Sequence, residues 1–376
     1  MAAVAIDRQS RVPHIMDDRH KNREGNKILI AASGTGSHLF PAIATAEHLE
    51  GPIEWLGVPD RLETELVPER YPLHTVRMGG VQGKLGLGTV KILTQFVQAT
   101  LATRRLLQQG NFQGVFTTGG YIAAPAIIAA RSLGLPAVLH ESNALPGKVT
   151  RWLSRWCSVV AVGFKETHQY LPKQTKVQWV GTPVRSQFLA DSNASLQNLT
   201  IPDEIPLIVV VGGSQGAVAV NQLVRAAAPA WLKAGAWIVH QTGNNDPDTD
   251  SLQHDHYIHR PFFDNVAALF KRATLVISRA GAGTLTELAM THTPSILIPY
   301  PFAADDHQAY NADAFGKVGA SKVYRQSELN GDILQKRVSA ILDHPEELAC
   351  MRVAAEALAI QNSAEQVAEL LQKMMR

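Results

Sequence analysis

Short apolar runs alternate with amphipathic stretches along most of the chain. Before residue 163 the runs are KILIAA, IEWLG, GVFTT, PAVLH and SVVAVG. Nearly continuous apolar runs are typical of parallel strands that are buried on both faces. The amphipathic stretches at 89–109 and 122–134 predict helices between them. This alternation therefore predicts βαβ units and a doubly wound α/β sheet.

The alternation stops at 181–205 and then resumes. Residues 181–205 are polar and contain no strand-like apolar run, which is typical of a connection between domains. The runs PLIVVVGG, AWIVHQTG, ATLVIS and PSILIPY follow, with helices expected from about residues 216 and 283. We therefore expect two Rossmann-like domains whose parallel sheets face each other across a cleft. A last helical pattern at 344–375 has no strand after it.

The length of the chain also favours two domains, because 376 residues exceed what one hydrophobic core usually organises. We expect a disordered tail at 1–26, a first domain at 27–186, a second domain at 187–355 and a helix at 356–376 that packs back on the first domain. The tail is polar and of mixed charge, and it lacks the apolar centre of a signal peptide.

Composition narrows the classes of function. A net charge of +2 provides no global field that would favour nucleic acid. No run approaches the ~20 apolar residues of a membrane-spanning helix, so we expect a cytoplasmic protein that is at most held on a membrane surface. The two cysteines, Cys157 and Cys350, form neither a disulfide framework nor a zinc site, and we expect two buried thiols.

Glycine-rich loops follow four of the expected strands. They are Gly34–His38, Gly119–Tyr121, Gly212–Gly216 and Ala280–Thr284. Such loops at the carboxyl ends of parallel strands bring backbone N–H groups and helix N-termini to a phosphate. Neither a Walker loop nor a complete dinucleotide fingerprint is present, since Leu39 takes the place of the third fingerprint glycine.

Three acidic or histidine features have competing explanations. Glu287, about one turn into the helix after the fourth loop, suits ribose hydroxyls or simply the helix dipole. Asp305–Asp306 could form a metal-binding carboxylate pair, but they precede a helix and are expected to be its caps and dipole partners. The alternating histidines of HDHYIHR, at 254–260, are expected to be a chance pattern, so we predict no metal site.

Seven segments in chain order resemble the MurG family of UDP-N-acetylglucosamine transferases. They are SGTGSHLFPA, TTGGYIAAPA, LHESNALPGKVTRWL, GTPVR, GGSQGA, SRAGAGTLTELA and DHQAYNA. The resemblance runs from about residue 27 to the C-terminus. It implies the glycosyltransferase B fold and inverting transfer of GlcNAc from UDP-GlcNAc to the MurNAc C4 hydroxyl of lipid I. The product would be lipid II for peptidoglycan synthesis, cell shape and cell division, made without a cofactor.

The resemblance also assigns residues by motif position. The expected UDP-GlcNAc contacts are Thr35, Gly36, Ser37, Asn143, Arg185, Ser214, Phe263, Ala282, Gly283, Thr284, Leu285, Thr286, Glu287 and Gln308. The expected acceptor diphosphate contacts are Gly34, Gly36, Gly119, Gly120 and Tyr121. Ser33 and Ser37 stand where the family pattern has glycines, and Ser142 departs from the usual HEQN.

His38 is the candidate catalytic base. An attacking sugar hydroxyl must lose its proton, and a histidine titrates close to neutrality. His38 follows the loop that would hold the acceptor diphosphate. A structural or helix-capping role is the alternative.

A lipid-linked acceptor requires that the protein reach a membrane. We expect a peripheral protein on the cytoplasmic face of the plasma membrane, with the loop 79–88 meeting an anionic leaflet through Leu85 and Leu87 beside Lys84 and Lys91. In the helix that follows, Leu93, Val97 and Leu101 are expected to pack inward.

Other proteins of cell-wall synthesis or division are compatible partners. The alternatives to this function are a transferase with another lipid acceptor, a UDP-GlcNAc 2-epimerase and a nucleotide-sugar-binding scaffold without turnover.

Overall fold

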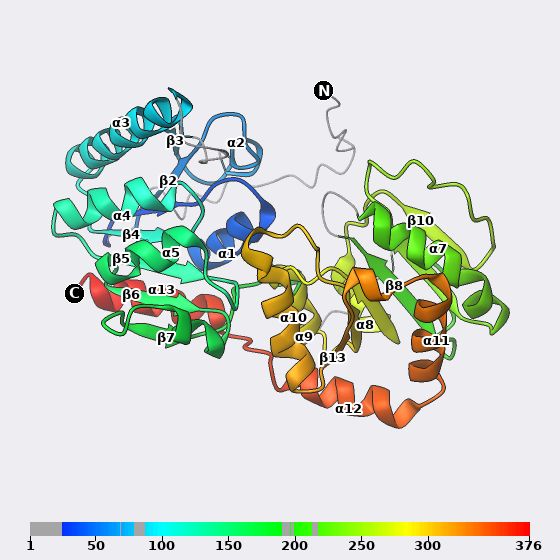
Figure 1. Ribbon diagram of the computed structural model, residues 1–376. Coiled ribbons are helices and arrows are strands. Elements are labelled where there is room, and N and C mark those ends of the chain that lie inside the picture. Colours follow the sequence, from blue (N-terminus) through cyan, green and yellow to red (C-terminus); the bar gives the residue numbers. More distant parts are fainter. Residues whose placement is uncertain (1–24, 68, 79–86, 190–195, 197–198, 213–216) are drawn as a thin grey trace.

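Two parallel β-sheets, each with its own helices, make up the computed structural model (Figure 1). It describes residues 25–67, 69–78, 87–189, 196, 199–212 and 217–376, with the backbone alone at 87–91. This is the arrangement of two Rossmann-like domains that the alternating pattern predicts.

The first sheet has seven strands in the order β3-β2-β1-β4-β5-β6-β7. The strands are β1 (Ile28–Ala31), β2 (Ile53–Gly57), β3 (Leu73–Thr75), β4 (Gly114–Thr117), β5 (Ala137–Glu141), β6 (Val159–Val162) and β7 (Val177–Trp179). The helices are α1 (Gly36–Ala46), α2 (Glu63–Leu66), α3 (Leu87–Gln109), α4 (Ala123–Ser132) and α5 (Lys148–Leu153), with the 3-10 turns η2 (Ser154–Trp156) and η3 (Lys165–Tyr170). Every side chain of β1 is fully buried, as expected for a central strand covered on both faces.

The second sheet has six strands in the order β10-β9-β8-β11-β12-β13. They are β8 (Leu207–Val211), β9 (Trp237–Gln241), β10 (Tyr257–Arg260), β11 (Leu275–Ser278), β12 (Ser295–Leu297) and β13 (Ser321–Val323). The helices of this half are α6 (Ser186–Leu189), α7 (Val218–Lys233), α8 (Val266–Arg272), α9 (Ala282–Met290), α10 (His307–Lys317), α11 (Gly331–Leu342) and α12 (Pro345–Glu356), with η4 (Ala304–Asp306) and η5 (Gln326–Glu328).

Each sheet reverses its strand order at one point, between β1 and β4 and between β8 and β11. In open α/β sheets, ligands bind beyond the carboxyl ends of the strands at such a switch point. The four glycine-rich loops follow these four strands. The topology therefore gives each half one ligand-binding position, at the place that the loops indicate.

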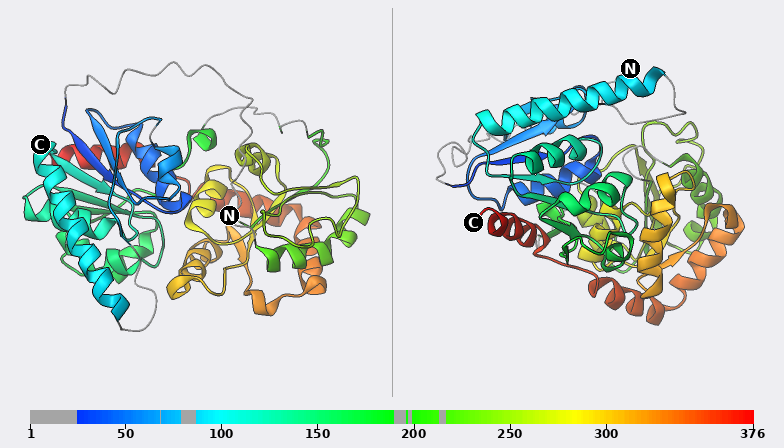
Figure 2. Two further views of the ribbon diagram at one scale, coloured as in Figure 1. Left: turned by 90° about the horizontal axis from the view of Figure 1, so that it is seen from above. Right: turned by 60° about the vertical axis from the view of Figure 1, so that its left-hand side comes forward.

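The C-terminal helical pattern forms two helices rather than one. After α12 the chain turns at 357–362, and α13 (Ser363–Met374) returns to the first half (Figures 1 and 2). Val367 and Leu371 of α13 are buried in one cluster with Ile28 and Phe116 of the first sheet. The end of the chain thus contributes to the core of the N-terminal half.

The prediction that Leu93, Val97 and Leu101 of α3 pack inward is wrong. Leu93, Val97 and Leu101 are 62%, 48% and 49% exposed. The helix instead buries Ala99, Thr103 and Leu107, four residues apart, and packs on the alanine-rich α4. Small side chains let two helices approach closely, which explains why α3 turns this stripe inward. Figure 2 shows α3 along the outside of the first half.

The expectation of two buried thiols holds for neither cysteine. Cys157 is half-buried and Cys350 is exposed. Burial raises the pKa of the Cys157 thiol to about 12.

Candidate functional site

His38 lies in the first turn of α1, directly over the second glycine loop. Its Nδ1 donates a hydrogen bond to the carbonyl of Thr118 over 2.8 Å, and Thr118 Oγ1 donates to the carbonyl of His38 over 2.9 Å. Because a carbonyl can only accept, the neutral ring carries its proton on Nδ1, and Nε2 is an acceptor with no hydrogen-bond partner among the described residues. A Cβ placed on Gly120 would lie 3.6 Å from that Nε2.

The first glycine loop is held by a buried carboxylate that the sequence did not single out. Glu63 is fully buried in α2, and its Oε2 accepts the N–H of Gly34 at 3.1 Å. Its Oε1 accepts the N–H of Val58 at 2.9 Å. Gly34 has a φ of +104°, which a larger residue would adopt only with strain. Glu63 therefore positions the loop ahead of His38.

Serine is compatible with the two loop positions where the family pattern has glycine. Five non-glycine residues among those described have a positive φ, and neither Ser33 nor Ser37 is one of them. The Ser37 hydroxyl lies 2.6 Å from that of Thr35. Thr35 is the N-cap of α1 and makes no side-chain cap bond, so the helix start keeps N–H groups for a ligand.

Phe40 and Arg185 join the first loop to the second half. A Cβ on Gly36 would lie 2.6 Å from the Phe40 ring, so a larger residue there would force the ring to move. The guanidinium of Arg185 lies 4.9 Å from the centre of that ring, and its Nη2 donates to Oε1 of Glu287 over 2.7 Å. The Nε of Arg185 is buried and has no hydrogen-bond partner among the described residues. A buried, unpaired cationic donor is costly, so it favours an anion at this point.

Glu287 faces Arg185 from α9. Burial raises the pKa of the Glu287 carboxyl, while the Arg185 guanidinium opposes that rise. The N-cap of α9, Gly281, has no side chain to cap the helix, and among the described residues no side chain bonds the first N–H groups of α9.

The loop that contains HESN is fixed by Glu141. This carboxylate accepts the N–H and the side-chain amide of Asn143, the N–H of Gly147 and the hydroxyl of Thr150. The other end of the Asn143 amide, Oδ1, accepts from Nδ2 of Asn311 over 3.1 Å. Asn143 therefore contacts the second half as well as its own loop.

Asn311 is a second residue that the sequence did not single out. It lies fully buried in α10, and its Oδ1 accepts the N–H of Ala144 over 2.8 Å. Its Nδ2 also donates to the carbonyl of Ala280. One amide thus ties the fourth glycine loop to the loop of Asn143.

Gln308 presents one defined end of its amide. Its Oε1 accepts the N–H groups of Ala280 and Tyr300, at 3.2 and 2.9 Å. Among the described residues its NH₂ group has no hydrogen-bond partner, so it can donate to a ligand. Leu285, in contrast, is fully buried in the core of the second half, so a ligand can reach only its backbone.

The remaining expected donor contacts lie as follows. Ala282 is buried, and Gly283, Thr284 and Thr286 are partly exposed on the first turns of α9. Phe263 is buried, and its N–H is taken by Oε1 of Gln241 at 3.2 Å. Ser214 lies outside the described residues, as do Lys84 and Leu85, and the side chains of Leu87 and Lys91 are not described.

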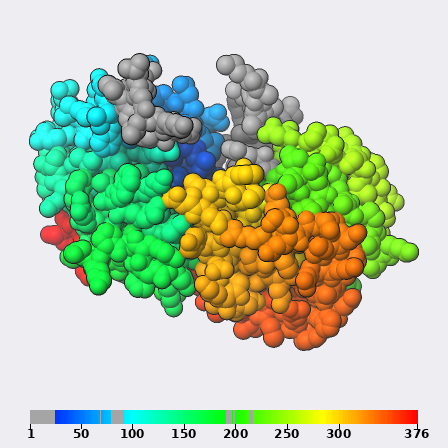
Figure 3. Space-filling view, in the orientation of Figure 1, coloured from blue at the N-terminus to red at the C-terminus, as the bar shows by residue number. Residues whose placement is uncertain are grey.

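The expected capping role of Asp305–Asp306 is wrong. Asp306 makes no side-chain cap bond at α10, and both residues have a positive φ, of 52° and 56°. Asp305 instead pairs with Arg151 of the first half over 2.5 Å, and Asp306 pairs with Arg325. Figure 3 shows the two halves in contact where residues near 300–310 meet the first half.

Within the described residues, no group of three or more histidine, cysteine, aspartate or glutamate side chains is arranged to hold a metal ion. Every helix in the same residues is too short or too polar to cross a bilayer.

Comparison with known proteins identifies the family. The glycosyltransferase family 28 N-terminal domain matches residues 28–162, and the C-terminal domain of that family matches residues 207–371. A protein of Trichormus variabilis is 61% identical over 350 residues, covering 93% of this chain and 98% of its own. It is named UDP-N-acetylglucosamine--N-acetylmuramyl-(pentapeptide) pyrophosphoryl-undecaprenol N-acetylglucosamine transferase. The chain belongs to this transferase family.

Related proteins agree with that membership. A Nostoc protein with the same name is also 61% identical over 350 residues, covering 93% of this chain and 98% of its own. The crystal structure of MurG from Acinetobacter baumannii superposes with a TM-score of 0.74 at 28% identity, covering 93% of this chain and all of that one. The glycosyltransferase B fold is thereby confirmed. Family membership also sets the 2-epimerase alternative aside.

Proposed function

We propose that the chain transfers GlcNAc from UDP-GlcNAc to the MurNAc C4 hydroxyl of lipid I, with inversion, and so makes lipid II. Two relatives that are 61% identical to this chain carry the name of this transferase, which supports the activity. Within the site, the proposal rests on His38. Its Nδ1 is bonded to the carbonyl of Thr118 at the switch point of the first sheet, and its Nε2 is left without a partner among the described residues.

In this reaction His38 takes the proton of the attacking hydroxyl at Nε2. The bond from the hydroxyl oxygen to the anomeric carbon forms as the bond to the UDP oxygen breaks, and the electron pair leaves with UDP. The acceptor diphosphate would lie at Gly34, Gly36 and the second loop of Gly119, Gly120 and Tyr121. The N–H groups at the start of α1 suit that charge.

The leaving diphosphate would lie between Arg185 and the start of α9. The unpaired Nε of Arg185 and the uncapped helix end are fixed donors that need no reorganisation as charge develops. Glu287 would accept a ribose hydroxyl, and the free NH₂ of Gln308 would donate to a sugar oxygen. By motif position, Thr35, Ser37, Asn143, Ser214, Phe263 and residues 282–286 complete the donor site.

We further propose that the protein acts at the cytoplasmic face of the plasma membrane. A lipid-linked acceptor requires this, and α3 provides a suitable surface. Leu93, Val97 and Leu101 form an exposed apolar stripe on this helix, and Arg104 and Arg105 lie on its next turn. An apolar stripe beside cations suits an anionic leaflet.

Transfer of radiolabelled GlcNAc from UDP-GlcNAc to a short-chain lipid I analogue tests the activity. The wild-type protein should form a labelled disaccharide product with and without a chelator. Binding of UDP-GlcNAc without product would exclude the acceptor assignment and would favour another lipid acceptor.

A further inference from the structure

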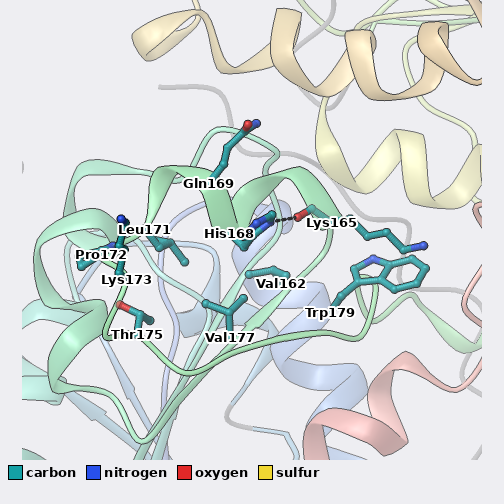
Figure 4. A pocket seen from close by; sticks show the side chains of 10 residues that line it. All are labelled: Val162, Lys165, His168, Gln169, Leu171, Pro172, Lys173, Thr175, Val177 and Trp179. Carbon is teal, nitrogen blue, oxygen red and sulfur yellow. Dashed lines mark hydrogen bonds between the residues drawn. The ribbon is translucent and has the colours of Figure 1, made fainter.

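A pocket of about 780 Å³ lies at the outer edge of the first sheet, away from His38 and the glycine loops (Figure 4). It forms where η3 and the turn after it pass over β6 and β7. The residues that line it are Val162, Lys165, His168, Gln169, Leu171, Pro172, Lys173, Thr175, Val177 and Trp179. None of them has a role in the proposed transfer.

The pocket combines an apolar floor with a cationic rim. Val162 and Leu171 are buried, and Val177 is partly exposed between them and solvent. Lys165 and Lys173 are exposed on either side of this floor, as Figure 4 shows. The Nζ of Lys165 lies 4.0 Å from the centre of the Trp179 ring, which holds the ammonium beside this lining residue.

The charge around the pocket is not balanced locally. The segment 165–179 contains three lysines, at 165, 173 and 176, and one acidic residue, Glu166. Glu166 does not line the pocket. None of the three lysines forms an ion pair with a described acidic residue. Their charges are therefore available to an anionic partner.

The strand beside the pocket has an open backbone edge. Among the described residues, β7 is the last strand of its sheet and pairs with β6 alone. The carbonyl of Lys176 and the N–H of Val180 bond to β6. Because backbone groups alternate in direction along a strand, the N–H and C=O groups of Val177 and Trp179 point away from the sheet. These groups can accept one more strand.

We propose that this edge binds an extended acidic peptide segment of a partner protein, which adds as a strand beside β7. Backbone bonds to Val177 and Trp179 give such a complex its affinity, and alternate side chains give it specificity. Because alternate side chains of a strand share one face, apolar side chains on the pocket's face would lie over Val177, toward Val162. A carboxylate at each end of that same face would meet Lys165 and Lys173 (Figure 4). Neither an isolated anion nor a purely apolar ligand would use all three features.

The test uses the full-length protein and a fluorescein-labelled peptide of sequence Glu-Thr-Leu-Thr-Leu-Thr-Glu, in which the leucines and both glutamates share one face of the strand. Fluorescence anisotropy should show saturable binding. The same peptide with lysine in place of glutamate should bind at least tenfold more weakly. The double variant Lys165→Glu/Lys173→Glu should reverse this preference, whereas Lys233→Glu, an exposed lysine at the end of α7, should leave it unchanged.

A second probe separates strand addition from simple charge attraction. Two peptides, methylated on the odd or on the even amide nitrogens, keep their charge and lose the backbone donors of one edge or of the other. The peptide whose methylated edge faces β7 should bind at least tenfold more weakly. Equal binding of the methylated and unmethylated peptides would overturn the strand model. Unchanged binding in Lys165→Glu/Lys173→Glu, with GlcNAc transfer and the unfolding midpoint retained, would overturn the site itself.

Discussion

Nη2 of Arg185 donates to Oε1 of Glu287 over 2.7 Å. Arg185 lies in the connection that follows the first sheet, and Glu287 lies on α9 of the second half. Burial raises the pKa of the Glu287 carboxyl, and the guanidinium opposes that rise. Each side chain therefore supports the other: Arg185 favours the ionised carboxylate, and Glu287 holds one end of the guanidinium, whose buried Nε has no partner among the described residues. The pair links the proposed ribose and diphosphate contacts in one unit.

Replacing Arg185 should slow the departure of UDP more than it weakens the binding of UDP-GlcNAc. We expect Arg185→Ala to lower kcat by ~10²–10³, the usual cost of losing one donor that stabilises developing charge. Arg185→Lys should recover only part of this loss, because an ammonium keeps the charge and lacks the fork. Steady-state kinetics with UDP-GlcNAc measure both, and Arg61→Lys, an exposed arginine after β2, is the control. A wild-type kcat in Arg185→Ala would refute the assignment.

His38→Ala should abolish most of the proton transfer while UDP-GlcNAc still binds. We expect kcat to fall by ~10²–10⁴, the range attributed to a positioned base. The donor Kd from calorimetry should stay within about twofold, because the ring contacts Thr118 and the second glycine loop of the first half. His48→Ala, at the end of α1, is the matched control. Loss of donor binding together with turnover would instead indicate a structural role.

Glu63→Gln tests whether the buried carboxylate positions the first loop. Glu63 accepts the N–H groups of Gly34 and Val58. A glutamine can accept only one of them and turns its own NH₂ group toward the other. An unsatisfied buried donor costs ~1–3 kcal/mol, so the free energy of unfolding should fall by about that amount. The acceptor KM should rise more than the donor KM. Equal effects on both would indicate general destabilisation only.

The Arg225–Asp246 pair should make the second half sensitive to acid. Burial alone would raise the pKa of Asp246, but the hydrogen bonds from Arg225 and Asn221 outweigh it, so the pKa lies below its usual value of 3.8. A lowered folded-state pKa stabilises the protein above the unfolded pKa, and this contribution is lost as the pH falls through the folded value.

Asp246→Asn should therefore cost ~3–5 kcal/mol at pH 7, the usual cost of breaking a buried pair. Its difference from wild type should shrink as the pH falls below 3.8. Urea unfolding between pH 7 and pH 3 measures this, with Asp203→Asn, whose carboxylate is 95% exposed, as the control. A difference that does not depend on pH would contradict the ion pair as its source.

The central strands and the four glycine loops were predictable because each depends on residues adjacent in the chain. The three-residue strands β3, β7 and β13 were not, since short edge strands lack a continuous apolar run. The orientation of α3 was not predictable either. Two stripes with the same four-residue spacing, one starting at Leu93 and one at Ala99, fit a helix equally well.

Glu63 and Asn311 were missed for a different reason. Glu63 acts on Gly34, 29 residues away, and Asn311 acts on Ala144, 167 residues away. A buried polar side chain that satisfies a distant backbone N–H leaves no local pattern. The motif residues around it mark the site, and the residue that positions them becomes visible only when the topology is known.

The exposed stripe of α3 should bind membranes, and its removal should leave the fold intact. We expect Leu93→Gln/Val97→Gln/Leu101→Gln to bind phosphatidylglycerol vesicles at least tenfold more weakly, since burying each side chain in lipid contributes up to ~1.5–3 kcal/mol. Because these side chains are exposed, the free energy of unfolding should change by less than ~0.5 kcal/mol per substitution. Val353→Gln, 67% exposed on α12, is the matched control for lost apolar surface.

Co-sedimentation at two salt concentrations separates the apolar and the ionic contributions. Binding through Arg104 and Arg105 should weaken as salt rises, whereas binding through the stripe should persist. The double variant Leu85→Ser/Leu87→Ser tests the expected contribution of the loop 79–88, of which residues 79–86 lie outside the described residues. Wild-type binding by the triple variant, together with lost binding by the loop variant, would assign docking to the loop alone. Transfer to a water-soluble acceptor analogue should proceed in both variants, because neither surface includes His38 or Arg185.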